Sequence, residues 1–153
     1  MSEESLVSEQ AKAMIGQETG PGEPFDVEKG WVRKFAEATL VPDPLYLDEA
    51  YASRAGYRGI VAPPGFLLYN IRSGTERDFD IPLPVGRRIK GADEVEFYAP
   101  VIVGDTITAN TRILDIYERA GKTGRMVFII SETIYTNQNG EVVQKSRATV
   151  IKR

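Results

Sequence analysis

The sequence predicts one α+β domain in which short helices come first and a long antiparallel sheet follows. Two observations carry this prediction. Helical spacing and clustered Gly–Pro breaks are confined to the first half of the chain, whereas β-branched runs separated by turn residues fill residues 90–151. A length of 153 residues suits a single domain with one core. We therefore expect one buried helix packed against one curved antiparallel sheet.

The N-terminal residues are expected to stand apart from this domain. Residues 1–13 predict a flexible or loosely docked leader, so that the folded domain covers residues 14–153. The start of the chain is acidic and has no apolar stretch of the kind that a secretory signal requires. Glycine and proline recur through residues 16–24 and predict a loop.

Two helices are predicted next. Apolar side chains recur at helical spacing over residues 28–39, which indicates an amphipathic helix. Pro42 and Pro44 prevent its continuation. Residues 48–52 carry acidic side chains in what would be a first helical turn, where they favour the helix dipole.

The apolar run at residues 65–71 predicts the central helix. It follows Pro63 and Pro64, and proline is favoured at the start of a helix. A helix that is apolar on nearly every side must be covered all round, so the sheet is expected to enclose it. Residues 74–86 contain two further prolines and predict a polar loop between this helix and the sheet.

The remaining residues predict a meander of strands joined by tight turns. Residues 121–124 and the Asn139–Gly140 pair are typical hairpin signals, and residues 103–106 favour a turn or bulge. The strands that these turns separate are expected at residues 90–98, 106–118, 125–135 and 141–151. Antiparallel neighbours follow directly from such short connections.

Composition excludes several classes of protein. Apolar residues make up 42% and charged residues 27% of the chain, as in ordinary globular proteins. The net charge of −3 disfavours nucleic acid as a partner, because phosphate binding needs an excess of Lys and Arg. No apolar run approaches the roughly 20 residues that span a bilayer, so no membrane partner is expected. The absence of cysteine suits a cytoplasmic location.

The chain has no histidine and no cysteine, and this limits its chemistry. A His-based triad, a cysteine nucleophile and the usual Cys/His zinc sites are therefore excluded. Acid–base catalysis would have to use carboxylates, tyrosine or lysine. No metal and no cofactor are expected.

Two motifs resemble the MaoC-like hydratases and dehydratases. Residues 97–107, FYAPVIVGDTI, are similar to the family stretch F-x-x-P-V-x-x-G-D-T-(I/L). Residues 52–66, ASRAGYRGIVAPPGF, resemble the A-x-x-x-G-(Y/F)-x-(G/D)-(I/L)-(I/V/L)-A-P-x-x-F stretch of the branch that includes the dehydratase region of fatty-acid synthases. The resemblance covers about residues 10–151. It implies the hot-dog fold, in which a long central helix is wrapped by a curved antiparallel sheet.

The catalytic pair of that family is missing at the matching positions. Catalytic members carry D-x-N-P-(I/L)-H, whose aspartate falls on Val41 and whose histidine falls on Tyr46. A valine cannot titrate, and the tyrosine pKa near about 10 is too high for an efficient base at neutral pH. Asp43 and Tyr46 are the fallback candidates, although Asp43 also suits a turn before Pro44. The resemblance thus implies a non-catalytic chain closest to the substrate-binding subunit of heterodimeric (3R)-hydroxyacyl thioester dehydratases.

The resemblance also suggests substrate-binding residues. Gly65 matches a family glycine at the start of the central helix, where its N–H would bind a thioester carbonyl or its small size would allow close packing. Aromatic residues nearby, including Tyr98, would either line a slot for an acyl tail or belong to the core. The candidate substrate-binding residues are Tyr46, Tyr51, Pro63, Pro64, Gly65, Phe66 and Tyr69.

Arg87, Arg88 and Lys90 form a compact basic cluster. They would face the phosphates of coenzyme A or of an acyl carrier protein, or would form a solvated loop. The substrate is therefore expected as a coenzyme A or carrier-protein thioester, in a role within lipid metabolism.

The expected partner is a second hot-dog subunit that supplies the Asp/His pair, in a heterodimer or heterotetramer. The joint reaction would hydrate an enoyl thioester or dehydrate the (3R)-hydroxyacyl form. Two alternatives remain open. One is a self-sufficient homodimeric hydratase that uses Asp43 and Tyr46, and the other is a non-enzymatic module that binds acyl thioesters.

Overall fold

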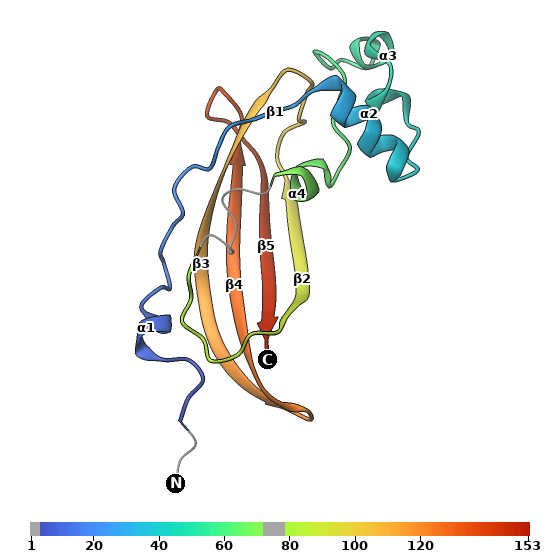
Figure 1. The fold of residues 1–153 in the computed structure, drawn as a ribbon. Coiled ribbons are helices and arrows are strands. Elements are labelled where there is room, and N and C mark those ends of the chain that lie inside the picture. The colour runs from blue at the N-terminus through green and yellow to red at the C-terminus, as the bar shows by residue number, and fades with distance from the viewer. Residues whose placement is uncertain (1–3, 72–78) are drawn as a thin grey trace.

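The computed structural model describes residues 4–71 and 79–153, which form one antiparallel sheet with short helices at one end (Figure 1). The five strands lie in the order β1-β3-β4-β5-β2. The short strand β1, Phe25–Asp26, borders β3, and β2 forms the opposite edge. The predicted α+β class and antiparallel sheet are confirmed.

The long strands follow the predicted meander. They are β2 (Arg88–Phe97), β3 (Thr106–Gly121), β4 (Gly124–Thr136) and β5 (Val142–Lys152). The β3–β4 hairpin closes between Gly121 and Gly124, as the glycines predict. Asn139 and Gly140 occupy the β4–β5 turn, where Gly140 has a φ of 74° that suits glycine.

Helix α2, Lys29–Ala38, and helix α3, Glu49–Arg54, lie beyond one end of the sheet, whereas α1, Glu9–Lys12, lies beside β3 toward the other end (Figure 1). Helix α2 confirms the predicted amphipathic helix and buries Val32 and Ala36. A one-turn 3-10 helix, η1 (Pro44–Tyr46), and helix α3 follow it. Asp43 caps η1 and Asp48 caps α3 through their side chains, which accounts for the acidic residues at these positions.

The expectation of a long central helix is wrong. Helix α4 spans only Phe66–Asn70, because Ile71 has extended backbone angles and ends it. It is also not covered all round, since Phe66 and Leu67 are buried while Tyr69 is 70% exposed. The apolar run is long enough for one buried turn and a half rather than for a helix that spans the sheet.

The predicted loop at residues 74–86 is not simply polar where it is described. Residues 74–78 lie outside the described part of the chain. From Phe79 onward every second residue is apolar, and these side chains pack against the core. Pro82 and Pro84 explain why this alternating stretch crosses the core without becoming a strand.

The core has two parts that a row of buried polar side chains separates. One cluster, near the helices, centres on Phe66, Leu67 and Ile107. The other, near the far end, centres on Ile113 and Ile129. The polar row between them consists of aligned residues on β3, β4 and β5, namely Thr111, Thr133 and Ser146. The Thr111 and Thr133 hydroxyls hydrogen-bond at 2.7 Å, which satisfies them within the core.

The N-terminal segment from residue 4 runs along the sheet beside β3 (Figure 1). Helix α1, Glu9–Lys12, buries Ala11, and Val7 is buried with it in the second cluster. The Leu6 backbone N–H donates to Glu118 Oε2 at 2.7 Å. The described part of the predicted leader therefore packs on the sheet, while the domain boundary at residue 14 stays a prediction.

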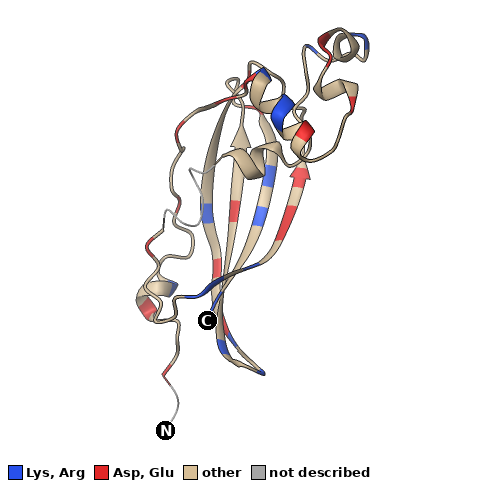
Figure 2. Cartoon of the chain, turned by 45° about the vertical axis from the view of Figure 1, so that its right-hand side comes forward, with Lys and Arg blue, Asp and Glu red and all other residues tan. Residues whose placement is uncertain are grey.

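Charges on the sheet form a cross-strand ladder near the end that adjoins the helices. Glu94 and Glu96 on β2 lie opposite Arg147 and Lys145 on β5. Figure 2 shows these acidic and basic residues side by side on the two strands. Arg147 also lies 3.7 Å from Glu132 on β4. Alternating charges of this kind favour the observed register of the three strands.

Candidate functional site

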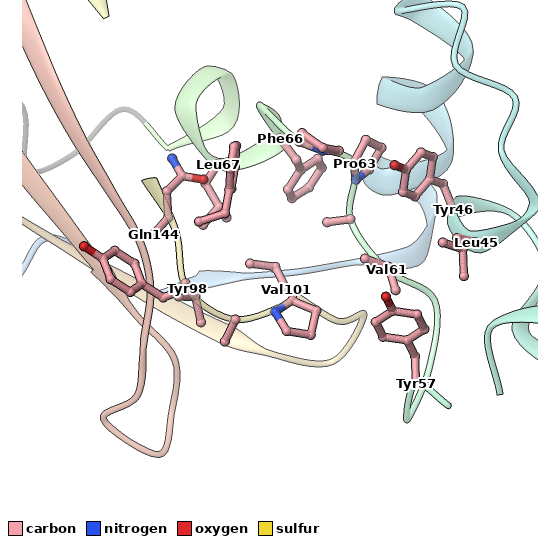
Figure 3. A pocket seen from close by; sticks show the side chains of 16 residues that line it. Leu45, Tyr46, Tyr57, Val61, Pro63, Phe66, Leu67, Tyr98, Val101 and Gln144 are labelled. Atoms are coloured by element: carbon pink, nitrogen blue, oxygen red, sulfur yellow. The ribbon is translucent and has the colours of Figure 1, made fainter. Parts of the chain in front are cut away.

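A pocket of about 360 Å³ lies where the helical end meets the β2 edge of the sheet. Three parts of the chain form its walls: η1, the segment from Tyr57 into α4, and the strand ends where β2 and β5 meet. Figure 3 shows Tyr46 and Tyr57 at one end of the pocket and Tyr98 and Gln144 at the other. The side chains between them are apolar, so the site suits a hydrocarbon chain.

Backbone hydrogen bonds hold the middle wall in place. Val61 N–H donates to Leu45 O at 3.0 Å, which ties this wall to η1. Ala62 N–H donates to Val101 O at 2.8 Å, which ties it to the segment after β2. Pro63 and Pro64 then turn the chain into α4. The two family-like motifs of the sequence thus meet directly, and together they build the pocket.

A buried carboxylate anchors the same region. Asp105 is fully buried and accepts hydrogen bonds from Arg58 Nη2 at 2.5 Å, Ile102 N–H at 2.9 Å and Gln138 Nε2 at 3.0 Å. Burial opposes its charged form, but the bonds from Arg58, Ile102 and Gln138 outweigh burial and leave the pKa of Asp105 below its usual value. Asp105 therefore ties the loop before the pocket wall to the β4–β5 turn.

Tyr46 lines the pocket at the position of the family histidine. Burial raises the pKa of the Tyr46 hydroxyl, and Asp43 and Tyr57 add to the increase. A hydroxyl whose pKa lies above its usual value is deprotonated even less at neutral pH, so less phenolate is available to act as a general base. Val41, at the position of the family aspartate, is 41% exposed and does not line the pocket.

The pocket brings together some of the predicted substrate-binding residues. Those that line it are Tyr46, Pro63, Pro64 and Phe66, together with the aromatic residue Tyr98. Tyr51 and Tyr69 are exposed and lie outside the lining. Their roles in binding stay predictions.

Gly65 also lies outside the pocket lining. Its φ of 89° places it in the left-handed region, which gives a conformational reason for glycine before α4. Asp43 accepts a hydrogen bond from Leu45 N–H at 2.9 Å and so serves as a cap of η1. The fallback catalytic role of Asp43 stays a prediction.

The basic cluster lies at the opposite end of β2 from the pocket. Arg88 begins the strand and Phe97 ends it, so about 30 Å separates them at about 3.3 Å per residue. Lys90 Nζ pairs with Asp93 Oδ2 at 2.5 Å. The phosphate-binding role of this cluster stays a prediction.

Two pocket residues were not among the predicted site residues. Tyr57 stands at the (Y/F) position of the second motif, which is the signal that could have found it, whereas Gln144 lies within a predicted strand and had no such signal. Gln144 reaches the pocket because its backbone is in register with Phe97, at the end of β2. Such a register depends on pairing between distant segments, which composition and periodicity do not reveal.

Comparison with known proteins identifies the family. A family model described as "FAS1-like, dehydratase domain region" matches residues 13–146. The chain belongs to this FAS1-like dehydratase family. A relative in Thermobifida fusca, a UPF0336 protein, is 33% identical over 133 residues, which cover 85% of this chain and 86% of the relative.

Solved structures confirm the hot-dog fold of this FAS1-like dehydratase chain. The HadBC (3R-hydroxyacyl-ACP dehydratase) complex of Mycobacterium tuberculosis matches with a TM-score of 0.74 and 24% identity over 90% of this chain and 96% of that chain. The ChsH1-ChsH2 complex of the same organism matches with a TM-score of 0.70 and 22% identity over 94% of this chain and 86% of that chain. The chain thus shares the fold of both complexes.

Membrane-spanning helices and metal-binding groups are both absent among the residues that the structure describes. No helix among residues 4–71 and 79–153 is long and apolar enough to cross a membrane. In the same residues no group of three or more Asp or Glu side chains is placed to hold a metal ion.

Proposed function

We propose that this chain is the substrate-binding, non-catalytic subunit of a two-subunit enoyl-thioester hydratase or (3R)-hydroxyacyl-thioester dehydratase. A partner hot-dog chain would supply the Asp/His pair. The observation that carries the proposal is a largely apolar pocket whose lining, among the described residues, includes Tyr46 but no Asp, Glu or Lys side chain. The fatty or other acyl chain would lie in this pocket, and the partner would hold the reacting carbons.

The electrostatics of the pocket support a non-catalytic role. Tyr46 and Tyr57 carry hydroxyls at one end of the pocket, and the pKa of Tyr46 is raised by burial and by Asp43. Dehydration requires a base to remove a proton next to the thioester carbonyl and an acid to protonate the departing hydroxide. The Tyr46 hydroxyl therefore does not suit the first step at neutral pH.

The edge of the sheet supports a partner. Strand β2 pairs only with β5 among the described strands, so its outer edge has unused backbone groups. Phe97 and Tyr98 at the end of β2 line the pocket and yet are 58% and 51% exposed. A chain that covers this edge would close the pocket and bury both rings, which is how β edges are commonly protected. The HadBC and ChsH1-ChsH2 assemblies, as two-component complexes of the same fold, are consistent with such a partner.

Co-expression with a hot-dog chain that carries the D-x-N-P-(I/L)-H motif tests the proposal. We expect the two chains to co-purify and to hydrate a medium-chain enoyl thioester together, with no activity from this chain alone. The matched control replaces the motif histidine of the partner with alanine, which should abolish activity without separating the chains. A homodimer that hydrates the thioester without any partner would contradict the proposal.

The self-sufficient alternative makes a different prediction. If Asp43 and Tyr46 catalysed the reaction, the purified chain would be active and Asp43→Asn would remove that activity. The capping bond from Leu45 N–H to Asp43 favours a structural role, and an asparagine keeps this bond. The non-enzymatic alternative predicts thioester binding without activity in any combination of chains.

A further inference from the structure

One polar side chain in the pocket has no partner. Gln144 is 2% exposed, lines the pocket, and its Nε2 atom is buried without a hydrogen bond. Buried amide groups are nearly always hydrogen-bonded, because removing them from water without compensation is unfavourable. An unpartnered amide in a pocket wall therefore requires an explanation in terms of what fills the pocket.

The other polar groups of the pocket do not satisfy this amide. The Tyr98 hydroxyl donates to Glu96 Oε2 at 2.5 Å, and its oxygen does not accept a hydrogen bond from Gln144 Nε2. Tyr46 and Tyr57 lie at the opposite end (Figure 3). The side chains around Gln144 in the lining are apolar, and they include Leu67 and Val143.

The position of Gln144 is fixed by the sheet and not by a mobile loop. Its backbone lies in β5, paired with Phe97 on β2 and with Tyr135 on β4. The neighbouring side chain on the same face, Ser146, is also buried and hydrogen-bonds the Tyr135 hydroxyl. The amide is thus held on a rigid element at one end of an otherwise apolar site, as specificity groups in ligand pockets usually are.

We propose that Gln144 is a specificity-determining residue whose side-chain amide donates a hydrogen bond to an oxygen of the bound acyl group. This inference rests on the proposed function, since it assumes that an acyl thioester occupies the pocket. The pocket would then prefer an acyl group that carries an acceptor oxygen at the Gln144 end over a plain hydrocarbon. That oxygen is either the thioester carbonyl or a carbonyl or hydroxyl further along the chain.

Calorimetric binding of three probes to the full chain, kept in one assembly state, tests this proposal. The probes are S-octyl-pantetheine, which has no acyl oxygen, octanoyl-pantetheine, and an octanoyl-pantetheine with a keto group on the penultimate carbon. We expect at least one oxygen-bearing probe to bind roughly 3- to 10-fold more tightly than its partner without that oxygen, the range of one neutral hydrogen bond. Tighter binding of octanoyl than octyl identifies the thioester carbonyl, and tighter binding of the keto probe identifies the chain oxygen.

Gln144→Met removes the amide with little change in volume, and the preference should then disappear. Gln144→Leu should repeat this result. Arg147→Met is the matched control, because it lies on the same strand but is exposed and faces Glu132. A preference that survives in Gln144→Met, or equal binding of all probes to the natural chain, would overturn the inference while leaving the proposed function intact. Failure of every probe to bind would overturn both.

Discussion

Two glutamines near the site differ in hydrogen bonding, and replacing them should change the free energy of unfolding in opposite directions. The Gln144 amide is buried without a partner at Nε2, whereas Gln138 donates to Asp105 and accepts from Thr106 N–H, each at 3.0 Å. In the ligand-free chain Gln144→Met should raise the free energy of unfolding by about 1 kcal/mol, because it removes an unpaired buried group.

Gln138→Met should lower the free energy of unfolding by about 1–3 kcal/mol, since it removes one of the three hydrogen bonds to Asp105 and the acceptor of the Thr106 N–H. Urea unfolding of both variants beside the natural chain measures the two changes. A loss of stability in Gln144→Met would show that its amide is satisfied in the free protein.

The Asp105 carboxylate should make stability depend on acid. Its pKa lies below the usual value in the folded chain, so its contribution is complete above the unfolded pKa and is lost as pH falls through the folded pKa. Asp105→Asn should therefore be less stable by about 1–3 kcal/mol at neutral pH. The difference in the free energy of unfolding between the natural chain and Asp105→Asn should become smaller below about pH 4. Urea unfolding of both proteins at a series of pH values measures this difference.

Glu118 also contributes to the acid dependence, because a hydrogen bond from Arg125 lowers its pKa. The natural chain and Asp105→Asn both keep Glu118, so the difference between their free energies of unfolding reflects Asp105 alone. A Glu118→Gln chain is the control for the remaining slope. A difference that stays constant from neutral pH to pH of about 3 would contradict the role given to the Asp105 charge.

At the residue scale the sequence predicted the site in part. Tyr46, Pro63, Pro64 and Phe66 belong to one local segment or to a motif, and they line the pocket. Tyr57 belongs to the same motif but was not predicted as a site residue, and Gln144 carries no local signal. Gln144 enters the site only through its register with β2, and register is a property of paired strands and not of either strand alone.

At the scale of elements, the ends of two helices hold left-handed residues of opposite kinds. Leu40 follows helix α2 with a φ of 56° and is 86% exposed, so it bears conformational strain with little packing in return. Gly65 precedes α4 with a φ of 89° and has no such strain. Glycine is the usual residue after a helix in this conformation.

Leu40→Gly should leave stability unchanged or raise it by up to about 1 kcal/mol, whereas Gly65→Ala should lower it by about 1 kcal/mol. An added Cβ at Gly65 would lie 3.7 Å from Tyr69 and 3.8 Å from Phe35, which is ordinary contact, so the loss would come from the backbone. Thermal unfolding of the pair checks both signs. A stabilised Gly65→Ala chain would refute the conformational explanation.

Some elements could be predicted from the sequence pattern and one could not. Helix α2 and the hairpins were predictable because their periodicity and turn residues are local. The length of the central helix was not, because the apolar run is compatible with either a long helix or one buried turn. Residues 79–85 pack against the second cluster and so cover the part of the sheet that a longer helix would have covered.

At the scale of the whole molecule, the exposed aromatic rim of β2 should control assembly. Phe97→Lys should weaken association with the partner chain by about 10-fold or more, because it places a charge on an apolar contact. Circular dichroism should remain unchanged, since the ring is already more exposed than buried.

Ile15→Lys is the matched control. Ile15 is also exposed, but it lies next to β3, toward the edge of the sheet that is farthest from β2. Analytical ultracentrifugation of each variant with the partner measures the effect. Equal weakening by both substitutions would indicate that association does not depend on the β2 edge.

The overall architecture was largely predictable, because it follows from a meander of long strands with short turns. The two motifs at their observed separation indicated the family, and the backbone bonds between residues 60–62 and 101–103 show why they occur together. The edge through which the chain would assemble with a partner could not be predicted from the sequence. An unpaired edge strand can be identified only when the order of all strands is known.

The row of Thr111, Thr133 and Ser146 across the sheet divides the core into two clusters, and this division has an evolutionary consequence. Residues far apart with no shared partners contribute independently to stability. Substitutions around the pocket therefore change the first cluster while the second continues to hold the sheet together. Natural selection can vary the cargo of such a domain at one end without first rebuilding the other, which makes the same framework available for many acyl groups.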